Sequence, residues 1–441
     1  MQIGKKQREK GAIWVWLSSL CLAAILTTVA IMLLVVLRNG LGVFWPSRLA
    51  LLTLADGTRA LGEVTQWQAS ADASGRRVQL KIGNRDLYGL DFRWFDEAAI
   101  RQFTYPADAV CLERREHGNF YGFLKGTIQT PTATFVDVGG REKAIALSDV
   151  VRFRRPNAMS LPAKLAFCGG RLWELLTGEP REANTEGGLF PAIVGTVMMV
   201  FLMSIFSFPL GVITAIYLRE YAKDGLVVRL VRIAVSNLAG IPSIVYGIFG
   251  LGFFVYGVGG ALDRLFFSAR LPTPTFGTGG ILWASLTLAL LTVPVVIVAT
   301  EEAFAAIPNG VREGSLALGA TQLQTLLRVL LPMASPGILT GFILAMARAA
   351  GEVAPLMITG VVKLAPSLPV DGSFPYVHLN RKFMHLGFHI YDVGFQSPNV
   401  EAAKPMVFVT TMLLVLIVLL LSSAAIVLRN QMKKRYTITS F

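Results

Sequence analysis

The sequence predicts an all-α polytopic membrane protein with six transmembrane helices and a small, mostly β insert domain. Of its 441 residues, 53% are hydrophobic and only 16% are charged, whereas soluble domains carry about 25% charged residues. Six apolar runs are each long enough for the roughly 20 helical residues that cross a bilayer. A polar stretch, residues 39–188, separates the first run from the other five.

The apolar runs each predict one membrane-spanning helix, because only helices satisfy their own backbone polar groups within a single segment in lipid. Five of the runs contain no Asp, Glu, Lys or Arg. The first run follows a cationic stretch, as a signal peptide would, but it is longer than the usual apolar region of about 7–15 residues. We therefore expect a retained anchor over residues 1–38. The six runs are 13–37, 189–218, 233–262, 279–300, 336–362 and 406–428.

The distribution of Lys and Arg predicts the orientation of the chain. If the N-terminus is cytoplasmic, the segments on that side carry most of the short-loop cations, as the positive-inside rule requires. Lys5, Lys6, Arg8 and Lys10 precede the first run, and Lys433, Lys434 and Arg435 follow the last. We therefore expect both termini to be cytoplasmic in a cell inner membrane. The net charge of +13 then reflects topology and attraction to anionic lipid rather than nucleic-acid binding, because the cations form no single stripe.

The polar insert, residues 39–188, is predicted to be a small β domain on the extracytoplasmic side. Turn signals at Asp56-Gly57, Gly83-Asn84 and Gly139-Gly140 separate short runs with strand character. Residues 161–176 have the pattern of an amphipathic helix that returns to the membrane. Two interpretations stay open: a domain that docks an outer partner or regulates, and a decoration with no chemistry. The predicted strands are 49–55, 60–66, 78–82, 87–95, 109–114, 121–128 and 132–138.

The three cysteines leave a second choice open. Cys111 and Cys168 both fall in the insert, where an oxidising compartment would allow them to pair. They are equally consistent with two free thiols, so the sequence predicts neither state.

The segment 301–335, between the fourth and fifth runs, has the pattern of a helical hairpin. Pro308-Asn309-Gly310 is a turn signal. Glu313 opens the second helical stretch, where a negative charge favours the positive end of a helix. Gly319 permits a change of direction, and Pro332 and Pro336 are expected to mark the return into lipid. Taken alone, this pattern also fits a plain capped connection between two helices.

The spacing within the hairpin resembles the EAA loop of ABC importer permeases. In that family a glutamate, a glycine and an aliphatic-x-Leu-Pro group follow one another at fixed intervals, and the loop forms a coupling helix that inserts into a cleft of the ATP-hydrolysing subunit. The two alanines that usually follow the glutamate are replaced here by Gly314 and Ser315. The resemblance implies that the following residues couple to the ATPase: Glu313, Gly319, Val329, Leu331 and Pro332.

A more specific resemblance extends over about residues 190–430. Segments 237–247, 294–303 and 347–356 are similar to the A-type permease subunit of phosphate ABC importers. The insert is not part of the minimal family pattern and looks like an extended N-terminal form. The resemblance implies a type I importer permease core over 189–441, which imports inorganic phosphate. It also implies a sister permease subunit in a heterodimer, two ATP-binding subunits, an extracytoplasmic phosphate-binding protein and no cofactor.

Arg348 and Glu352 are the two charges inside the fifth apolar run. Their spacing of four predicts that they share one helix face. An unpaired charge at mid-bilayer costs at least about 2.5–3.5 kcal/mol, so such groups face a bundle interior or water. One interpretation is a buried ion pair that fixes packing. The other is a polar step in an anion pathway, where the guanidinium fork suits phosphate oxygens and the carboxylate prevents tight trapping.

Other functional classes find less support in the sequence. No G-x-x-x-x-G-K-[ST] pattern occurs, so we expect a transport subunit whose ATP hydrolysis is carried by a separate chain, and no enzyme. His378, His385 and His389 lie in the outer loop 363–405 without an obvious thiol or acidic partner, so no metal site is predicted there. The aromatic residues of that loop predict contact with a binding protein.

Three alternative functions remain open. The first is a permease for another oxyanion, such as sulfate or molybdate. The second is an ion-coupled secondary transporter that uses Arg348 and Glu352. The third is a membrane-anchored, outer-face interaction protein whose active part is the insert.

Overall fold

The computed structural model describes residues 3–69, 75–125, 131–223 and 225–436, with side chains of the first helix described from Trp14 onward. The chain forms two compact units, residues 1–188 with 397–412 and residues 189–396 with 413–441. Within the described residues, six helical segments are long and apolar enough to cross a membrane, which confirms the predicted fold class. These segments are Trp14–Gly42, Phe190–Tyr221, Ser243–Phe266, Ile281–Ala305, Gln322–Gly351 and Val400–Lys434.

The first unit begins with one long helix, α1 (Ile3–Gly42). Its described side chains are mostly apolar and almost all exposed, from Trp14 at 72% to Leu41 at 59%. A helix that is apolar on every side is suited to lipid. Only its last turn packs closely, because Gly40 lies against Met412 and the carbonyl of Phe408.

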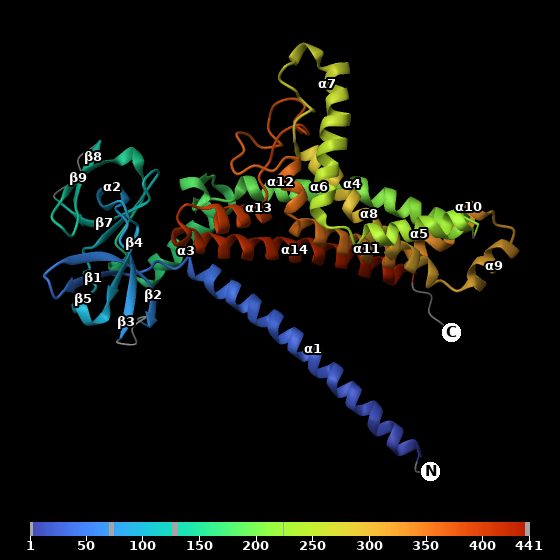
Figure 1. Cartoon of the computed structure of the whole chain (residues 1–441), viewed down its shortest axis with the longest axis horizontal. Coiled ribbons are helices and arrows are strands. Elements are labelled where there is room, and N and C mark those ends of the chain that lie inside the picture. The colour runs from blue at the N-terminus through green and yellow to red at the C-terminus, as the bar shows by residue number, and fades with distance from the viewer. Residues whose placement is uncertain (1–2, 70–74, 126–130, 224, 437–441) are drawn as a thin grey trace. The chain divides into compact units, whose positions relative to one another are not determined.

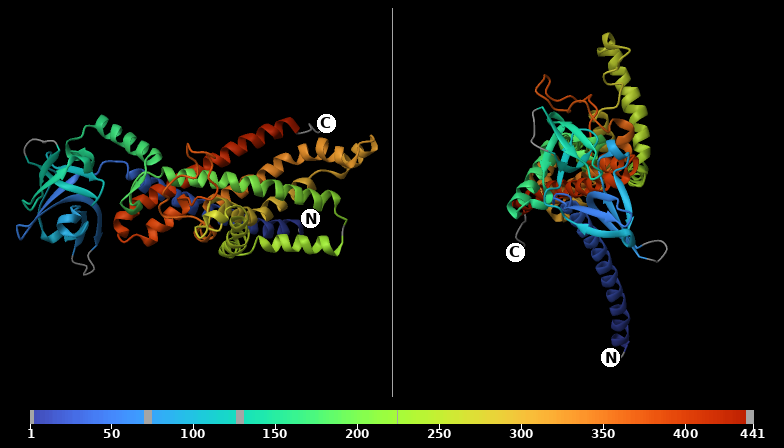
Figure 2. Two further views of the ribbon diagram at one scale, coloured as in Figure 1. Left: turned by 90° about the horizontal axis from the view of Figure 1, so that it is seen from above. Right: turned by 90° about the vertical axis from the view of Figure 1, so that its left-hand side faces the viewer.

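Two five-stranded antiparallel sheets follow, and together they confirm the β-rich insert (Figures 1 and 2). The first sheet has the order β4-β3-β2-β1-β5 and the second β10-β6-β7-β8-β9. Their strands are β1 (Leu49–Leu54), β2 (Arg59–Ala69), β3 (Arg76–Lys81), β4 (Phe92–Asp96), β5 (Ile100–Thr104), β6 (Val110–Arg114), β7 (Asn119–Leu124), β8 (Thr132–Val136), β9 (Glu142–Ala146) and β10 (Val150–Arg154). A short ribbon, β11 (Pro180–Arg181) with β12 (Glu186–Gly187), lies beside the helix α3 (Leu161–Thr177) in sequence.

Apolar residues buried on both faces of these strands build the cores of the insert. In β1, Leu49 and Leu52 are fully buried, and in β7 Phe120 and Tyr121 are fully buried. The turns form as their sequences predict: Gly57, Gly83, Asn84 and Gly140 all have positive φ, the conformation that glycine and asparagine tolerate best.

The insert also differs from the sequence prediction, which did not include the strands β5, β9 and β10. Residues 87–95 were expected to form one strand, but the chain forms a short helix, α2 (Arg85–Tyr88), before β4 begins at Phe92. Asn84 in the left-handed conformation starts that turn, and its side chain bonds the backbone of Tyr121 on both sides. Residues 126–128 of the predicted strand 121–128 lie outside the described residues. Cys111 and Cys168 are both free thiols.

The second unit is helical. Its helices are α4 (Phe190–Ile216), α5 (Leu226–Leu238), α6 (Ser243–Phe249), α7 (Gly260–Phe266), α8 (Ile281–Ala305), α9 (Asn309–Ala317), α10 (Gln322–Thr325), α11 (Leu331–Gly351), α12 (Ala354–Thr359) and α13 (Leu386–Tyr391). Wider π-helical turns join several of them: η5 (Tyr217–Tyr221), η6 (Gly250–Gly259), η8 (Leu326–Leu330) and η9 (Asp392–Gln396). The last helix, α14 (Val400–Tyr436), contributes residues to both units.

Helix α8 is the centre of the second unit, because it packs against both α4 and α11. Its approach to α11 is close: a Cβ built on Gly341 would lie 2.5 Å from the Cβ of Ala299, and one on Gly337 equally near Ala303. Small residues one turn apart allow helix backbones to come together in this way. The core around them includes Met199, Leu288 and Leu356, all fully buried.

Two apolar runs differ from the helices that form. The run 233–262 covers the end of α5 and the start of a separate span, because Gly240 and Pro242 interrupt the helix between them. The run 336–362 predicts a helix whose first and last residues both lie further along the chain than those of the helix that forms. The fifth span extends from Gln322 to Gly351, and Pro336 lies inside α11. Pro336 therefore does not mark the start of a helix.

Candidate functional site

The hairpin 301–335 is the part of the chain whose sequence pattern carried the strongest functional prediction. Helix α8 ends at Ala305 and α9 begins at Asn309, directly after Pro308. Gly319 has φ +84, and the position where its Cβ would stand is open space, so glycine serves the backbone turn there rather than close packing. Figure 1 shows α9 and α10 together at one end of the helical unit.

The second half of the hairpin starts with a complete capping box. The Thr321 hydroxyl accepts a hydrogen bond from the Gln324 amide at 3.2 Å, and the Gln324 side chain accepts one from the Thr321 amide at 2.9 Å. The Ser315 hydroxyl lies 2.9 Å from that of Thr325 and ties the two arms together. Reciprocal capping satisfies backbone donors that a helix start leaves free.

An apolar cluster fixes the hairpin to the helices that precede and follow it. Phe304, Ile307, Leu326 and Leu330 are buried together, and partly buried side chains of α4 pack against them. Burial of each such side chain is worth about 1.5–3 kcal/mol. These apolar contacts therefore hold the hairpin in a fixed position against the ends of the spans.

Arg312 makes the densest set of polar contacts in the hairpin. Its guanidinium bonds the Glu220 carboxylate with Nη2–Oε1 at 2.9 Å and Nε to both oxygens at 3.3 Å. The same group donates to the carbonyl oxygens of Phe304 (2.8 Å) and Ile307 (2.9 Å), where α8 ends. The Arg312 and Glu220 side chains are only 17% and 12% exposed. One guanidinium thus joins α9 to the ends of both α4 and α8.

The five residues predicted to couple to an ATPase occupy different surroundings. Glu313 and Gly319 are exposed, Val329 and Leu331 are half-buried, and Pro332 lies in the first turn of α11. Proline is well placed there, since the amide it lacks would have no helical partner. Leu331 packs against the apolar cluster of the hairpin. The structure therefore separates two solvent-facing positions, Glu313 and Gly319, from three that attach the hairpin to the spans.

The sequence analysis missed the pairing of Arg312 with Glu220, which lie 92 positions apart. Arg312 stands directly before the glutamate of the recognised motif, but nothing local marks its partner. Only the folded hairpin brings the end of the second span to the start of α9.

Arg348 and Glu352 do form an ion pair, with Arg348 Nε 3.6 Å from Glu352 Oε1. They do not share one helix face in mid-span, as was predicted. Helix α11 ends at Gly351, and Glu352 has the extended conformation φ −75, ψ 137. Gly351 disfavours continuation of the helix, and Pro355 sits in the first turn of α12. The pair therefore lies at a break between two helices, with 40% of the Arg348 side chain exposed.

Buried polar groups from the segment 363–396 surround the chain after this break. Val353 lies close to Gly387, two residues after His385. Burial lowers the pKa of His385 to about 3, and its Nδ1 accepts a hydrogen bond from the Gly387 amide at 3.1 Å. The buried Asp392 pairs with Lys363 at 3.1 Å. Among the described residues, no three His, Cys, Asp or Glu side chains converge on a point that would hold a metal ion.

The loop between α12 and α13 is ordered around Asp371. Its carboxylate accepts from the Ser373 hydroxyl and from Arg381, and it contacts His378. These hydrogen bonds, the one from Ser373 first, hold the pKa of Asp371 well below its usual range. The aromatic side chain of Phe374 is 86% exposed beside this network.

Comparison with known proteins places most of the second unit in one family. The model of the family described as "Binding-protein-dependent transport system inner membrane component" matches residues 207–434. This range includes the hairpin and the break after α11. It excludes α1 and the β-rich insert.

Three curated proteins illustrate the similarity. The probable phosphate transport system permease protein PstA of Methanocaldococcus jannaschii is 35% identical over 195 residues, 43% of this chain and 63% of that protein. The phosphate transport system permease protein PstA 1 of Mycobacterium tuberculosis is 36% identical over 172 residues, 39% of this chain and 51% of that protein. The probable ABC transporter permease protein YqgI of Bacillus subtilis is 30% identical over 237 residues, 52% of this chain and 74% of that protein. The first two matches thus span between half and two thirds of their relatives' length.

Proposed function

The chain belongs to the family of binding-protein-dependent transport system inner membrane components, and we propose that it is the permease subunit of an ATP-driven importer of inorganic phosphate. The proposed substrate is inferred from the similarity of the chain to two phosphate transport permeases. The observation that supports an external engine is the hairpin 301–335, which exposes Glu313 beside an anchored base.

The partners follow from the same proposal. An importer of this kind needs a sister permease subunit, two ATP-binding subunits and an extracytoplasmic phosphate-binding protein. The chain then places both termini and the hairpin in the cytoplasm and the insert outside, which the excess of Lys and Arg near the termini supports.

In the proposed mechanism the hairpin carries the movement. Closure of the ATP-binding subunits displaces α9, and Arg312 transmits this displacement to the ends of α4 and α8 through Glu220 and the carbonyls of Phe304 and Ile307. The spans then alternate between outward and inward openings, each favoured by a different ligand.

The charged pair after α11 supplies a step for the anion. We propose that the Arg348 guanidinium binds phosphate oxygens while Glu352 competes for it, so that the anion is released again. The partial exposure of Arg348 supports this role, since a buried structural pair would leave no surface for a ligand.

The decisive experiment is purification of the full chain in mild detergent from cells that also express the proposed partner subunits. The co-eluting subunits are identified, and ATP-dependent phosphate uptake is then measured in proteoliposomes. Glu313→Arg should abolish co-elution of the ATP-binding subunit and abolish uptake. The matched control is Glu97→Arg, the same charge reversal at an exposed site of the insert. It should leave both properties unchanged.

Two other functions would give different results. Uptake that continues without an ATP-binding subunit, or that survives Glu313→Arg, would indicate an ion-coupled secondary transporter. Competition distinguishes the oxyanions: sulfate or molybdate that suppresses phosphate uptake at equal concentration would favour an importer of those anions.

A further inference from the structure

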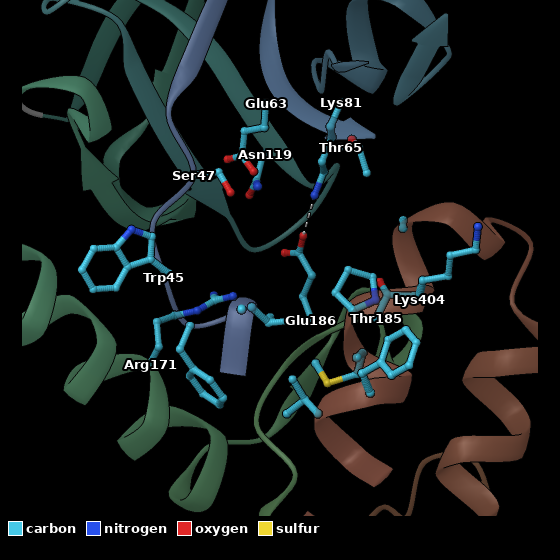
Figure 3. A pocket seen from close by; sticks show the side chains of 18 of the residues that line it. Trp45, Ser47, Glu63, Thr65, Lys81, Asn119, Arg171, Thr185, Glu186 and Lys404 are labelled. Atoms are coloured by element: carbon cyan, nitrogen blue, oxygen red, sulfur yellow. Dashed lines mark ion pairs between the residues drawn. The ribbon is translucent and has the colours of Figure 1, made fainter. Parts of the chain in front are cut away.

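A cavity of about 380 Å³ opens inside the first unit, where the β-strands meet the ends of two membrane-spanning segments (Figure 3). Its walls come from the last turn of α1, the strands β2, β3 and β7, the helix α3, and the first turns of α14. A cavity of this size falls within the range of small-molecule sites. Nothing in the proposed transport function uses it.

The lining of the cavity combines apolar and charged side chains. The apolar ones include Val43, Phe44, Phe167, Met406 and Phe408. The charged and polar ones come from the strands, where Figure 3 shows Glu63, Lys81 and Asn119, and from the helices α3 and α14, which contribute Arg171 and Lys404. A ligand that fills the cavity must therefore have an apolar part and a polar part.

The positive and negative charges that line the cavity are close to balance. Four cationic and five anionic residues line the cavity. The carboxylates are engaged by cations, as in Glu63 with Arg154 at 3.2 Å and Glu113 with Arg171 at 3.2 Å. A purely anionic ligand would face five carboxylates and a purely cationic one would face four cations. A ligand with one charge of each sign fits both.

Two buried polar atoms on this wall lack partners. Within the described part of the chain, Asn119 Oδ1 and Arg154 Nε form no hydrogen bond. Asn119 is 8% exposed and the Arg154 side chain 10%. Buried donors and acceptors without partners are rare and costly. The site therefore offers one acceptor and one donor to a bound molecule.

The cavity also lies at the ends of two candidate membrane-spanning segments. The span Trp14–Gly42 ends in its wall, and the span Val400–Lys434 begins there. The two ends are in contact, since Gly40 packs against Met412. A lipid headgroup is the amphipathic molecule present at this depth, with acyl chains that would lie along the apolar surfaces of α1 and α14.

We propose that this cavity binds the headgroup of a zwitterionic phospholipid that carries a primary ammonium. Its phosphate oxygens accept hydrogen bonds from Arg171 and Arg154, and its ammonium donates to Asn119 Oδ1 and to the Glu63 carboxylate. A trimethylammonium group has no N–H to donate, so a choline lipid leaves Asn119 unsatisfied. An anionic glycerol headgroup adds a net negative charge to a cavity that is lined by five carboxylates and four cations.

Native mass spectrometry of the full chain tests this directly. The protein in mild detergent is exposed to equal amounts of phosphatidylethanolamine, phosphatidylcholine and phosphatidylglycerol with identical acyl chains. We expect one ethanolamine-lipid adduct, favoured over each of the others by about tenfold for each hydrogen bond gained. The chain offers two variants and a control that probe the site separately.

Arg171→Gln removes one phosphate donor, while Glu113 keeps its contact with Arg152 at 3.4 Å, so we expect a roughly tenfold weaker adduct. Gly42→Leu adds an apolar side chain at the cavity wall, where no heavy atom lies within 4 Å of the added Cβ, and should abolish the adduct. Arg101→Gln, at an exposed position of β5 outside the cavity, should behave like the wild type.

Several results would overturn the proposal. These are an absence of lipid adduct on the wild type, equal binding of the three lipids, a preference for phosphatidylglycerol, or an adduct that persists in Gly42→Leu. The last variant keeps every charge of the wall, so its result stands even where Arg171→Gln lowers expression.

Discussion

At the scale of single residues, the functional proposal depends most on Arg348 and its partner Glu352. The guanidinium is partly exposed at the point where α11 ends, 3.6 Å from the carboxylate. The sequence analysis identified the pair from its spacing but placed it in mid-helix. Hydropathy alone cannot show where a helix ends inside an apolar run, since Gly351 and Pro355 are themselves compatible with lipid.

Arg348→Gln should retain assembly and lose phosphate uptake, because an amide keeps most of the volume but not the charge that binds the anion. Uptake and co-elution of the ATP-binding subunit are measured on the same preparation. Glu352→Gln is the comparison: it keeps the guanidinium and should slow release rather than prevent binding. Normal phosphate accumulation by Arg348→Gln would show that the pair serves packing alone.

A second residue-scale prediction concerns the stability of the protein at low pH. The pKa of His385 is lowered to about 3 by burial, against about 6.5 in an unfolded chain. Below pH 6.5 the imidazole binds a proton in the unfolded state but not in the folded state. The free energy of unfolding therefore decreases as the pH falls below that value. Between pH 7 and pH 5 the loss is about 2 kcal/mol.

The melting temperature in detergent at pH 7 and pH 5 measures this effect. His385→Asn keeps an acceptor for the Gly387 amide and removes the titrating group, so its melting temperature should depend less on pH than that of the wild type. His117→Asn is the matched control, since His117 is exposed and has positive φ, which asparagine accepts. Equal pH dependence in wild type and His385→Asn would contradict the prediction.

At the scale of elements, the hairpin shows how far sequence reasoning extends. Its existence, its turns and the exposure of Glu313 and Gly319 agree with a local pattern. Its attachment could not be predicted, because Glu220 lies at the end of a helix two spans earlier. The boundaries of the spans were likewise imprecise, since hydropathy does not distinguish the amphipathic helix α5 from the span that follows it.

Arg312→Ala should abolish most of the uptake while the ATP-binding subunit still co-elutes, because α9 remains exposed but loses its link to α4 and α8. The partly buried Glu220 carboxylate would be left unpaired, at a cost of about 1–3 kcal/mol. Arg312→Lys keeps the positive charge but not the planar set of guanidinium donors, so its uptake should lie between those of the wild type and Arg312→Ala. Arg328→Ala, which removes an exposed arginine from the same hairpin, should transport normally.

A charge exchange sharpens this test. Glu220→Arg combined with Arg312→Glu restores opposite charges but offers no donor to the carbonyls of Phe304 and Ile307. We therefore expect uptake to stay low in the double variant. Full recovery would show that the ion pair alone, without the carbonyl contacts, holds the hairpin.

At the scale of the whole molecule, the insert and the permease core are separable in sequence. The family match covers 207–434 and omits the insert, and the two sheets have buried cores of their own. The class of the insert was predictable, because apolar alternation and glycine turns are local signals. Its role was not, because the cavity beside α1 combines residues that lie far apart in the chain, from Asn39 to Val409.

Replacement of residues 46–188 by a flexible Gly/Ser linker of about 20 residues should leave phosphate uptake within several-fold of the full chain, since the proposed hairpin and anion step are untouched. The ethanolamine-lipid adduct should disappear, because most of its cavity is removed. Uptake is compared with the full chain at equal amounts of co-eluted ATP-binding subunit. Complete loss of uptake in an assembled complex would favour the view that the insert is the active part.

The apolar character of α1 has a consequence for how the protein is made. Its candidate span Trp14–Gly42 is 29 residues long with a mean hydropathy of 2.9, so it can enter the bilayer as soon as it leaves the ribosome. Translation at about 5–20 residues per second then leaves on the order of ten seconds before the second span emerges. During that interval the β-strands can fold while tethered to a membrane already anchored by a single segment. Folding of the β-rich insert would thus precede insertion of the remaining spans.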